Sequence, residues 1–207
     1  MMNMMKTNPN FEIESGCAGT IAGVDEAGRG PLCGPVVAGA VIFLRRDIEI
    51  PVIIRDSKQM TAAQRDAAYD WITANTIWAT GACSPAEIDE LNILWASMRA
   101  MERAVDALAL KPNFCLIDGN RVPKNLNGRA VVKGDAKSLS IAAASIVAKV
   151  TRDRLMHELA QKYPEYGWEN NAGYPTPSHL IAIKKYGINE HYRRSFGPVK
   201  KILEQEG

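Results

Sequence analysis

The chain has 207 residues, of which 46% are hydrophobic and 23% charged, and its formal net charge is +2 at pH 7. These values are typical of one globular domain, or of one domain with an extension, and they supply enough apolar residues for a core. No apolar run approaches the roughly 20 residues that a membrane-spanning helix needs, and the polar residues 1–10 do not resemble a secretory signal. The composition therefore argues against a membrane protein.

The four cysteines are scattered and form no C-x-x-C pair. This pattern indicates reduced thiols in a cytoplasmic protein rather than a disulfide framework or a zinc site. Charge is also uneven along the chain: acidic side chains outnumber lysine and arginine in residues 1–118, and the reverse holds in residues 119–207. This asymmetry fits a carboxylate centre beside a phosphate-binding surface. A mixed, solvated surface explains it equally well.

Strands and helices alternate in the predicted order of elements. Five apolar runs have the length and composition of strands: residues 20–25, 36–44, 76–83, 114–117 and 130–133. A sixth run, residues 48–54, contains Pro51 and is at best an edge strand, because proline cannot donate to a sheet ladder. Periodicity and capping residues predict helices over 62–75, from Ser84 onward, over 93–110, from Ser138 or Ser140 to Lys162, and over 178–186 and 197–205. This alternation indicates an α/β layer.

A glycine-rich loop separates the first two strands. It contains Gly28, Gly30 and one cation, Arg29, and it directly follows two adjacent carboxylates, Asp25 and Glu26. Glycine lets a backbone approach a ligand closely. Carboxylates at a strand end beside such a loop suggest a metal site that faces a polyanion.

Carboxylates stand at the ends of three predicted strands. Asp25 and Glu26 end the first, Asp118 ends the strand over 114–117, and Asp135 follows the strand over 130–133. The sites of α/β sheets lie at strand carboxyl ends, and carboxylates that meet there raise each other's pKa unless a cation offsets their charge. Magnesium and manganese accept such oxygen ligands. No histidine or cysteine cluster is present for zinc.

Asp25 and Glu26 pose a geometric question. Neighbouring residues of a regular strand point to opposite faces. We therefore expect the strand to end or bulge between them if both belong to one site. In the alternative interpretation, one is a ligand and the other is an N-cap or surface residue.

Other common motifs are absent. The glycine spacing does not match G-x-G-x-x-G, and the chain contains no phosphate-binding G-x-x-x-x-G-K-[S/T] loop. It also lacks a G-x-S-x-G nucleophile elbow, so acyl hydrolysis has no evident nucleophile.

The motifs that remain resemble one known family. Residues 23–36, Gly-Val-Asp-Glu-Ala-Gly-Arg-Gly-Pro-Leu-Cys-Gly-Pro-Val, are very similar to the opening motif of type 2 ribonuclease H, the ribonuclease HII family. Further similar blocks follow in the same order: residues 56–58, 88–94, 118–121, 133–138, 141–153, 173–176 and 194–196. The resemblance extends from about residue 20 to about residue 198, with no departure at a catalytic position.

The resemblance implies an α/β, ribonuclease H-like fold: a five-stranded mixed sheet flanked by helices, with a helical C-terminal extension over about residues 163–207. The domain would span residues 19–207, after a flexible N-terminal tail over residues 1–18. The implied activity is endonucleolytic cleavage of RNA in RNA–DNA hybrids, and incision 5′ of a single ribonucleotide in duplex DNA, leaving 3′-hydroxyl and 5′-phosphate ends. Such incision would start ribonucleotide excision repair.

The resemblance also implies roles for particular residues. The four catalytic carboxylates map onto Asp25, Glu26, Asp118 and Asp135, which would hold two Mg²⁺ or Mn²⁺ ions. The loop residues Gly28, Arg29 and Gly30 would read the ribose. Tyr174 would pack on the sugar beyond the scissile phosphate. Candidate phosphate contacts adjoin the acidic motifs: Ser57, Lys58, Lys137 and Ser138.

The expected partners are RNA–DNA hybrids and duplex DNA that contains ribonucleotides, with no membrane partner, for a monomer in the cytoplasm. Two alternatives remain open. One is a nucleic-acid-binding module without catalysis, which the complete carboxylate set disfavours near phosphate. The other is a DNA-directed metal nuclease on the same fold, which the Gly28–Gly30 loop and Tyr174 disfavour.

Overall fold

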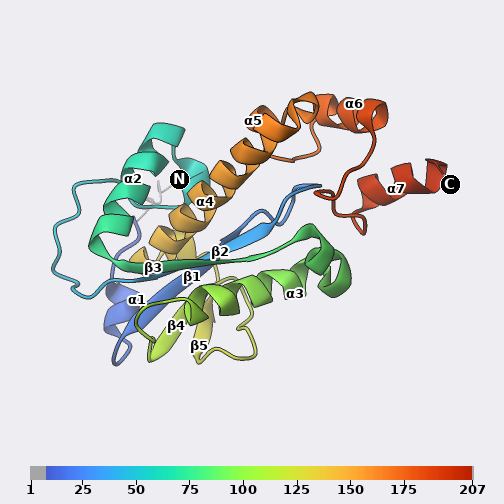
Figure 1. Cartoon of the computed structure of the whole chain (residues 1–207). Coiled ribbons are helices and arrows are strands. Elements are labelled where there is room, and N and C mark those ends of the chain that lie inside the picture. Colours follow the sequence, from blue (N-terminus) through green and yellow to red (C-terminus); the bar gives the residue numbers. More distant parts are fainter. Residues whose placement is uncertain (1–7, 207) are drawn as a thin grey trace, which may run out of the picture.

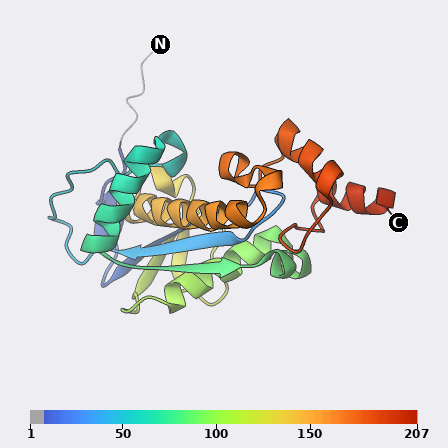
Figure 2. The ribbon, with the colours of Figure 1, turned by 45° about the horizontal axis from the view of Figure 1, so that its top comes forward.

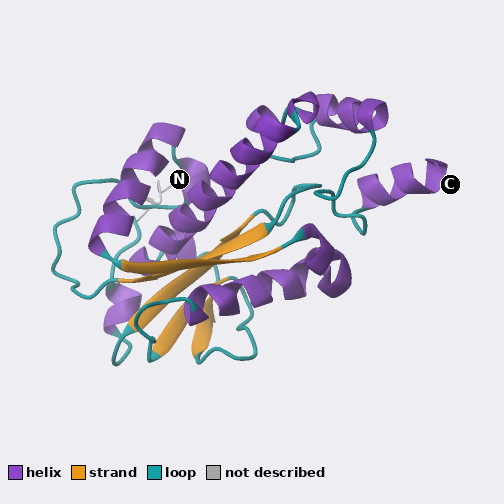
Figure 3. Cartoon of the chain, in the orientation of Figure 1, coloured by secondary structure: helices purple, strands orange, loops and turns teal. Residues whose placement is uncertain are grey.

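The computed structural model describes residues 8–206, and its centre is a five-stranded sheet in the order β3-β2-β1-β4-β5. The strands are β1 (Ile21–Ala27), β2 (Val36–Ile42), β3 (Ile77–Cys83), β4 (Phe114–Asp118) and β5 (Gly128–Val131). The pairs β1–β2 and β2–β3 are antiparallel, whereas β1–β4 and β4–β5 are parallel. The predicted mixed sheet of five strands is confirmed (Figure 3).

Helices flank this sheet. They are α1 (Glu12–Ser15), α2 (Ala62–Asn75), α3 (Pro85–Asp106), α4 (Leu139–Lys162), α5 (Trp168–Asn171), α6 (Pro177–Tyr186) and α7 (Gly197–Glu206), with short 3₁₀ turns η1 (Ser57–Gln59), η2 (Gly134–Ala136) and η3 (Pro164–Tyr166). Among the described residues, none of these helices is long and apolar enough to cross a membrane.

The two longest helices cover opposite faces of the sheet. Figure 2 shows α4 above the strands and α3 below them. Small residues allow this close packing: a Cβ at Gly23 would lie 2.1 Å from the Ser140 backbone in α4, and one at Gly81 would lie 2.4 Å from the Ala100 carbonyl oxygen in α3. The apolar, alanine-rich start of α4 is buried on every side, as its composition predicted.

Several helix starts agree with the sequence. Thr61 with Gln64, and Ser84 with Glu87, form complete capping boxes for α2 and α3. Ser138, one of two candidates, caps α4.

One doubtful strand is absent, and a predicted break between two helices is present. Residues 48–54 form no strand, because the run contains Pro51; Ile50 and Val52 instead pack against the core between α2 and α4. The two helices predicted from Ser84 and over 93–110 correspond to the two parts of α3, which are separated by the non-helical residue Asn92 (φ 62°, ψ 163°). The Asn92 side chain accepts a hydrogen bond from the Leu94 amide and restarts the helix.

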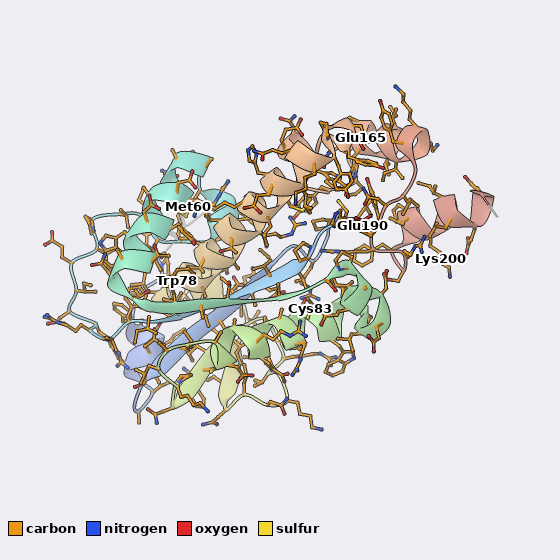
Figure 4. The ribbon with its side chains drawn as sticks, in the orientation of Figure 1. Met60, Trp78, Cys83, Glu165, Glu190 and Lys200 are labelled. Atoms are coloured by element: carbon orange, nitrogen blue, oxygen red, sulfur yellow. The ribbon has the colours of Figure 1, made fainter. Side chains whose placement is uncertain are left out.

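The C-terminal part forms a helical extension around an aromatic core, as the resemblance implied (Figure 1). The Tyr166 and Trp168 rings stack at 5.0 Å, and Tyr192 packs edge-on against Tyr166. Figure 4 labels Glu190, which lies in the segment between α6 and α7, and Lys200, which lies in α7.

The N-terminal segment requires a correction. We expected residues 1–18 to be a flexible tail; residues 1–7 of it lie outside the described residues. Residues 8–18 are held against the domain, because Glu14 is 1% exposed and bonds to the start of α4, while Asn10 pairs with Ser138.

Candidate active site

The site lies where β1 and β4 separate. Their pairing ends at Val24 and Ile117, while β1 continues beside β2 to Ala27. Beyond that point the side of β1 that faced β4 is open. Asp25 and Glu26 lie on this free part of β1, and Asp118 ends β4 at the same level.

This opening bears on whether Asp25 and Glu26 can belong to one site. The register of β1 with β2 continues one-to-one through both residues, so the bulge that we expected between them is absent. Both side chains nevertheless line one pocket together with Asp118 and Asp135. The strand therefore does not bulge between Asp25 and Glu26. What changes beyond Val24 is that β1 no longer has β4 beside it.

A short turn brings in the fourth carboxylate. After β5 the chain passes through Lys133 in the left-handed conformation (φ 55°) and enters η2, which contains Asp135. The Gly134 amide donates a 2.7 Å hydrogen bond to Asp118 Oδ1. The ends of β4 and β5 are thereby tied together at the pocket.

The carboxylates lie in an environment that disfavours their charge. Burial raises the pKa of Asp25 well above its ordinary value, and the charges of Glu26 and Asp118 raise it further. Burial also raises the pKa of Glu26, although Arg29, which forms a 3.0 Å salt bridge to it, opposes this shift. Burial and then Asp118 raise the pKa of Asp135. Carboxylates in this arrangement favour a nearby cation.

The donor set suits a hard divalent ion, because every candidate ligand is a carboxylate and the pKa shifts show mutual repulsion. Within residues 8–206, however, no group of three or more His, Cys, Asp and Glu side chains is arranged to hold a metal ion. Oxygens of three carboxylates have protein partners instead: Asp25 accepts from the Glu26 amide, Glu26 from Arg29, and Asp118 from the Gly134 amide.

Two buried arginines hold the glycine loop, which we define as residues 28–35. Arg193, 0% exposed, donates to the carbonyl oxygens of Gly28, Arg29 and Gly34 at 2.6, 3.1 and 3.0 Å. Arg152, 1% exposed, donates to those of Cys33 and Pro35 within the loop and of Ala172 outside it. Burial lowers the pKa of both guanidinium groups.

Five of these six carbonyl contacts lie within the loop. Among residues 8–206, neither arginine forms a salt bridge with a carboxylate. In Figure 1 the loop after β1 reaches the segment between α6 and α7, where Cys33 pairs with Tyr192. The shape of the loop thus depends on the C-terminal extension.

Tyr174 stands beside this loop with 43% of its surface exposed. A Cβ added to Gly30 would lie 3.3 Å from its ring. Its carbonyl oxygen is 2.8 Å from Nδ1 of the buried His179, whose Nε2 accepts a hydrogen bond from the Trp168 indole. Because an indole only donates, Nδ1 of neutral His179 carries the proton and donates to Tyr174. Burial lowers the pKa of His179, which favours this neutral form.

The structure brings most predicted site residues together. The pocket is lined by the four carboxylates, the Gly28–Gly30 loop, Tyr174, Ser57 and Lys58. Lys137 does not line it; its Nζ donates to the Val132 carbonyl. The expected phosphate contact at Ser138 is wrong, because this residue is 0% exposed and its hydroxyl caps α4 and bonds to Glu14.

Three further charged residues that line the pocket were not predicted as site residues: Asp56, Lys149 and Arg152. Arg152 had a signal, since it shares a helix face with Ala148 and Met156, both buried. A cation on such a face requires polar partners inside the protein. Asp56 caps η1 through the Lys58 amide, which the polar composition of that turn did not reveal.

An α/β sheet whose strand ends bring carboxylates together beside several cations is the arrangement expected of a metal-using enzyme that acts on phosphodiesters. The sequence and fold of known proteins narrow this class. The family model described as Ribonuclease HII matches residues 22–198. A ribonuclease HII of Magnetococcus marinus is 54% identical over 96% of this chain and 98% of its own length, and one of Vibrio cholerae is 50% identical over 94% of each.

Solved structures of similar proteins have the same fold as this chain. The ribonuclease H2 of Pyrococcus horikoshii superimposes with a TM-score of 0.75 at 32% identity, over 90% of this chain and 98% of that one. A ribonuclease HIII crystallised with Mn²⁺ has the same fold, with a TM-score of 0.66 at 19% identity, over 90% of this chain and 70% of that one. The chain belongs to the ribonuclease HII family. It is therefore an enzyme, a metal-dependent endoribonuclease of the ribonuclease H type.

Proposed function

We propose that this protein cleaves the RNA strand of RNA–DNA hybrids and incises duplex DNA on the 5′ side of a single embedded ribonucleotide, leaving a 3′-hydroxyl and a 5′-phosphate. The observation that carries the proposal is one pocket that joins four carboxylates to the glycine loop and Tyr174. The carboxylates supply the cleavage chemistry, and the loop and the tyrosine select the nucleotide.

Asp25 and Asp118 would be the central metal ligands, and Glu26 and Asp135 would complete the coordination. Two Mg²⁺ or Mn²⁺ ions bound there would supply an activated water and stabilise the leaving 3′-oxygen. The Gly134 amide fixes one oxygen of Asp118 and leaves the other for a ligand. Arg29 forms a 3.0 Å salt bridge to Glu26, a carboxylate that would also be available as a metal ligand.

The Gly28–Gly30 backbone would recognise the ribose. A 2′-hydroxyl distinguishes a ribonucleotide from a deoxyribonucleotide at one position, and glycine amides can approach it because no Cβ intervenes. The exposed Tyr174 ring beside Gly30 would pack on the next sugar. Arg193 keeps the carbonyls of Gly28 and Arg29 turned inward, so the loop keeps one shape for this recognition.

Cations at the pocket would bind the phosphates of the substrate. Ser57 and Lys58 adjoin the carboxylates, and Lys149 lines the same pocket. Burial raises the pKa of Asp135, and the nearby charge of Lys58 opposes that rise. These residues replace Lys137 and Ser138 as the phosphate contacts that we propose.

The test is incubation of the protein with Mg²⁺ or Mn²⁺ and a labelled DNA duplex that contains one ribonucleotide. We expect a single incision 5′ of the ribonucleotide, with an all-DNA duplex left intact. Binding without incision would support a nucleic-acid-binding module, and cutting of the all-DNA duplex would support a DNA-directed nuclease. Either result would refute the proposal.

The cellular setting is part of the proposal. The four cysteines are unpaired, which suits a reducing cytoplasm. A monomer is the oligomeric state that we propose. A relative at 26% identity is a ribonuclease HII of Archaeoglobus fulgidus, solved in complex with PCNA.

A further inference from the structure

The segment before β1 contacts the structure that carries Asp135. Glu14, in α1, is 1% exposed, and its Oε1 accepts hydrogen bonds from the Ser138 hydroxyl at 2.6 Å and the Ser140 amide at 2.9 Å. The Ser138 hydroxyl in turn accepts from the Ile141 amide. A single carboxylate oxygen therefore organises the first turn of α4, which begins four residues after Asp135.

These contacts continue to the pocket through two hydrogen bonds of Gly134. The Ser138 amide donates to the Gly134 carbonyl at 2.8 Å, and the Gly134 amide donates to Asp118 Oδ1 at 2.7 Å. Asp135 lies between these bonds in η2. Glu14 is thus connected through Ser138 and Gly134 to one catalytic carboxylate, and it borders the turn that carries another.

A second contact holds the same turn from outside. The Asn10 amide donates to the Lys137 carbonyl, and the Leu139 amide donates to the Asn10 carbonyl. Asn10 therefore pairs with residues 137–139 as a short added strand would. Glu14 caps the first turn of α4. The family model begins only at residue 22, after this segment.

Burial shows that Glu14 is more than a surface cap. Its other oxygen, Oε2, is buried and has no hydrogen-bond partner among the described residues. Burying a carboxylate oxygen without a hydrogen-bond partner costs free energy. A residue that only capped an exposed helix end would avoid this cost, because its side chain could reach solvent. The negative charge is favourable at this place because it faces the N-terminus of a 24-residue helix.

We propose that Glu14 is a positioning residue for the catalytic site: through Ser138 it sets the turn over residues 134–140, and thereby the places of Asp135 and Asp118. This inference rests on the proposed function for the role of those two carboxylates. The positioning itself is a statement about the fold and can be tested separately.

The experiment compares Glu14→Ala with Glu102→Ala. Glu102 is a matched control, because it is also buried (7% exposed) and also accepts from a backbone amide, that of Asn125, yet it does not line the pocket. Two measurements are made on each intact, metal-free protein. They are amide hydrogen exchange over residues 134–140 and Mn²⁺ binding by calorimetry.

In Glu14→Ala we expect exchange at residues 134–140 to accelerate by at least about tenfold, because the Ser140 amide loses its acceptor. We expect Mn²⁺ affinity to fall by about tenfold, the lower end of what outer-shell partners of metal ligands contribute. Glu102→Ala should change both by less than about twofold. Glu14→Gln, whose amide oxygen can accept from both donors, should restore both values to within about twofold of the original protein.

Normal exchange and Mn²⁺ affinity in folded Glu14→Ala would overturn the inference, and so would equal losses in Glu102→Ala. If Glu14→Ala does not fold, Glu14→Asp is used in its place. Aspartate keeps the charge, but its side chain is one carbon shorter and its oxygen is withdrawn from Ser138 and Ser140. The same losses in exchange protection and Mn²⁺ affinity are expected. The original protein is also assayed for incision at a ribonucleotide. Failure there refutes the proposed function, while the exchange data still decide whether Glu14 sets the turn.

Discussion

Gly28→Ala is expected to destabilise the protein strongly, because Gly28 combines a left-handed backbone with contact to a buried cation. Its φ is +93°, and an added Cβ would lie 2.1 Å from Arg152 Nε, 2.3 Å from Arg152 Cδ and 2.9 Å from the Pro35 carbonyl oxygen. Arg152 is 1% exposed, so its side chain has no open space into which to withdraw.

The magnitude follows from two contributions. A left-handed alanine costs about 1–2 kcal/mol. Displacing Arg152 Nε breaks at least its 3.0 Å bond to Pro35, and a hydrogen bond from a charged group contributes about 1.5–3 kcal/mol. The expected loss is therefore about 2.5–5 kcal/mol, which is a large share of the about 5–15 kcal/mol that stabilises a typical domain.

Urea unfolding followed by tryptophan fluorescence measures this loss, and Gly187→Ala separates its two parts. Gly187 also has a positive φ, +82°, but an added Cβ would meet nothing within 4 Å. Its ψ of −168° lies in a region essentially reserved for glycine, so that variant should lose only a backbone part of about 1–3 kcal/mol. In an Arg152→Ala background the excess cost of Gly28→Ala should disappear, since the clashing side chain is gone. Equal losses for Gly28→Ala and Gly187→Ala in the original protein would refute this reasoning.

Further predictions concern the site. Asp118→Asn should fold normally, because its amide oxygen can still accept from Gly134, yet lose at least about 100-fold in incision rate, or about 2.7 kcal/mol; near-normal turnover would contradict the metal role. Tyr174→Ala should impair incision at a single ribonucleotide more than binding of a uniform hybrid, and an equal loss on both would count against sugar packing. Substrate binding should weaken steeply between about 50 and 200 mM salt if several lysines contact phosphates, whereas a flat response in a filter-binding titration would argue otherwise. His179 should make stability fall as the pH decreases from about 6.5, because burial lowers its folded pKa and the unfolded chain takes up the proton first. Urea unfolding at several pH values should therefore show a smaller fall in His179→Gln than in the original protein.

Local signals in the sequence predicted the elements well. The capping box at Thr61 placed α2 correctly at residues 62–75, and Ser84 with Glu87 placed the start of α3. The strand predicted over 130–133 lies instead at Gly128–Val131. The apolar side chains of residues 130–133 indicated the wrong bounds for this strand, because Val132 is 59% exposed while Gly128 packs closely on Cys115.

The site was predictable as far as it depends on strand ends. Asp25, Glu26, Asp118 and Asp135 do line one pocket. The supporting contacts were not predictable, because they join side chains to backbone carbonyls far along the chain, and a carbonyl has no signature in sequence. Ser138 shows the same limit: a serine beside an acidic motif is compatible with a phosphate contact or a helix cap, and only its burial distinguishes them.

The arginine contacts of the glycine loop bear on when the enzyme becomes active during its synthesis. The bonds from Arg193 to Gly34, Arg29 and Gly28 span 159, 164 and 165 positions of the chain. A nascent or prematurely terminated chain that ends between residues 136 and 192 already contains all four carboxylates, but it has no means of forming these bonds. Such a fragment would carry the four carboxylates without the Arg193 contacts that hold the glycine loop. The loop therefore gains these contacts only after residue 193 has been added.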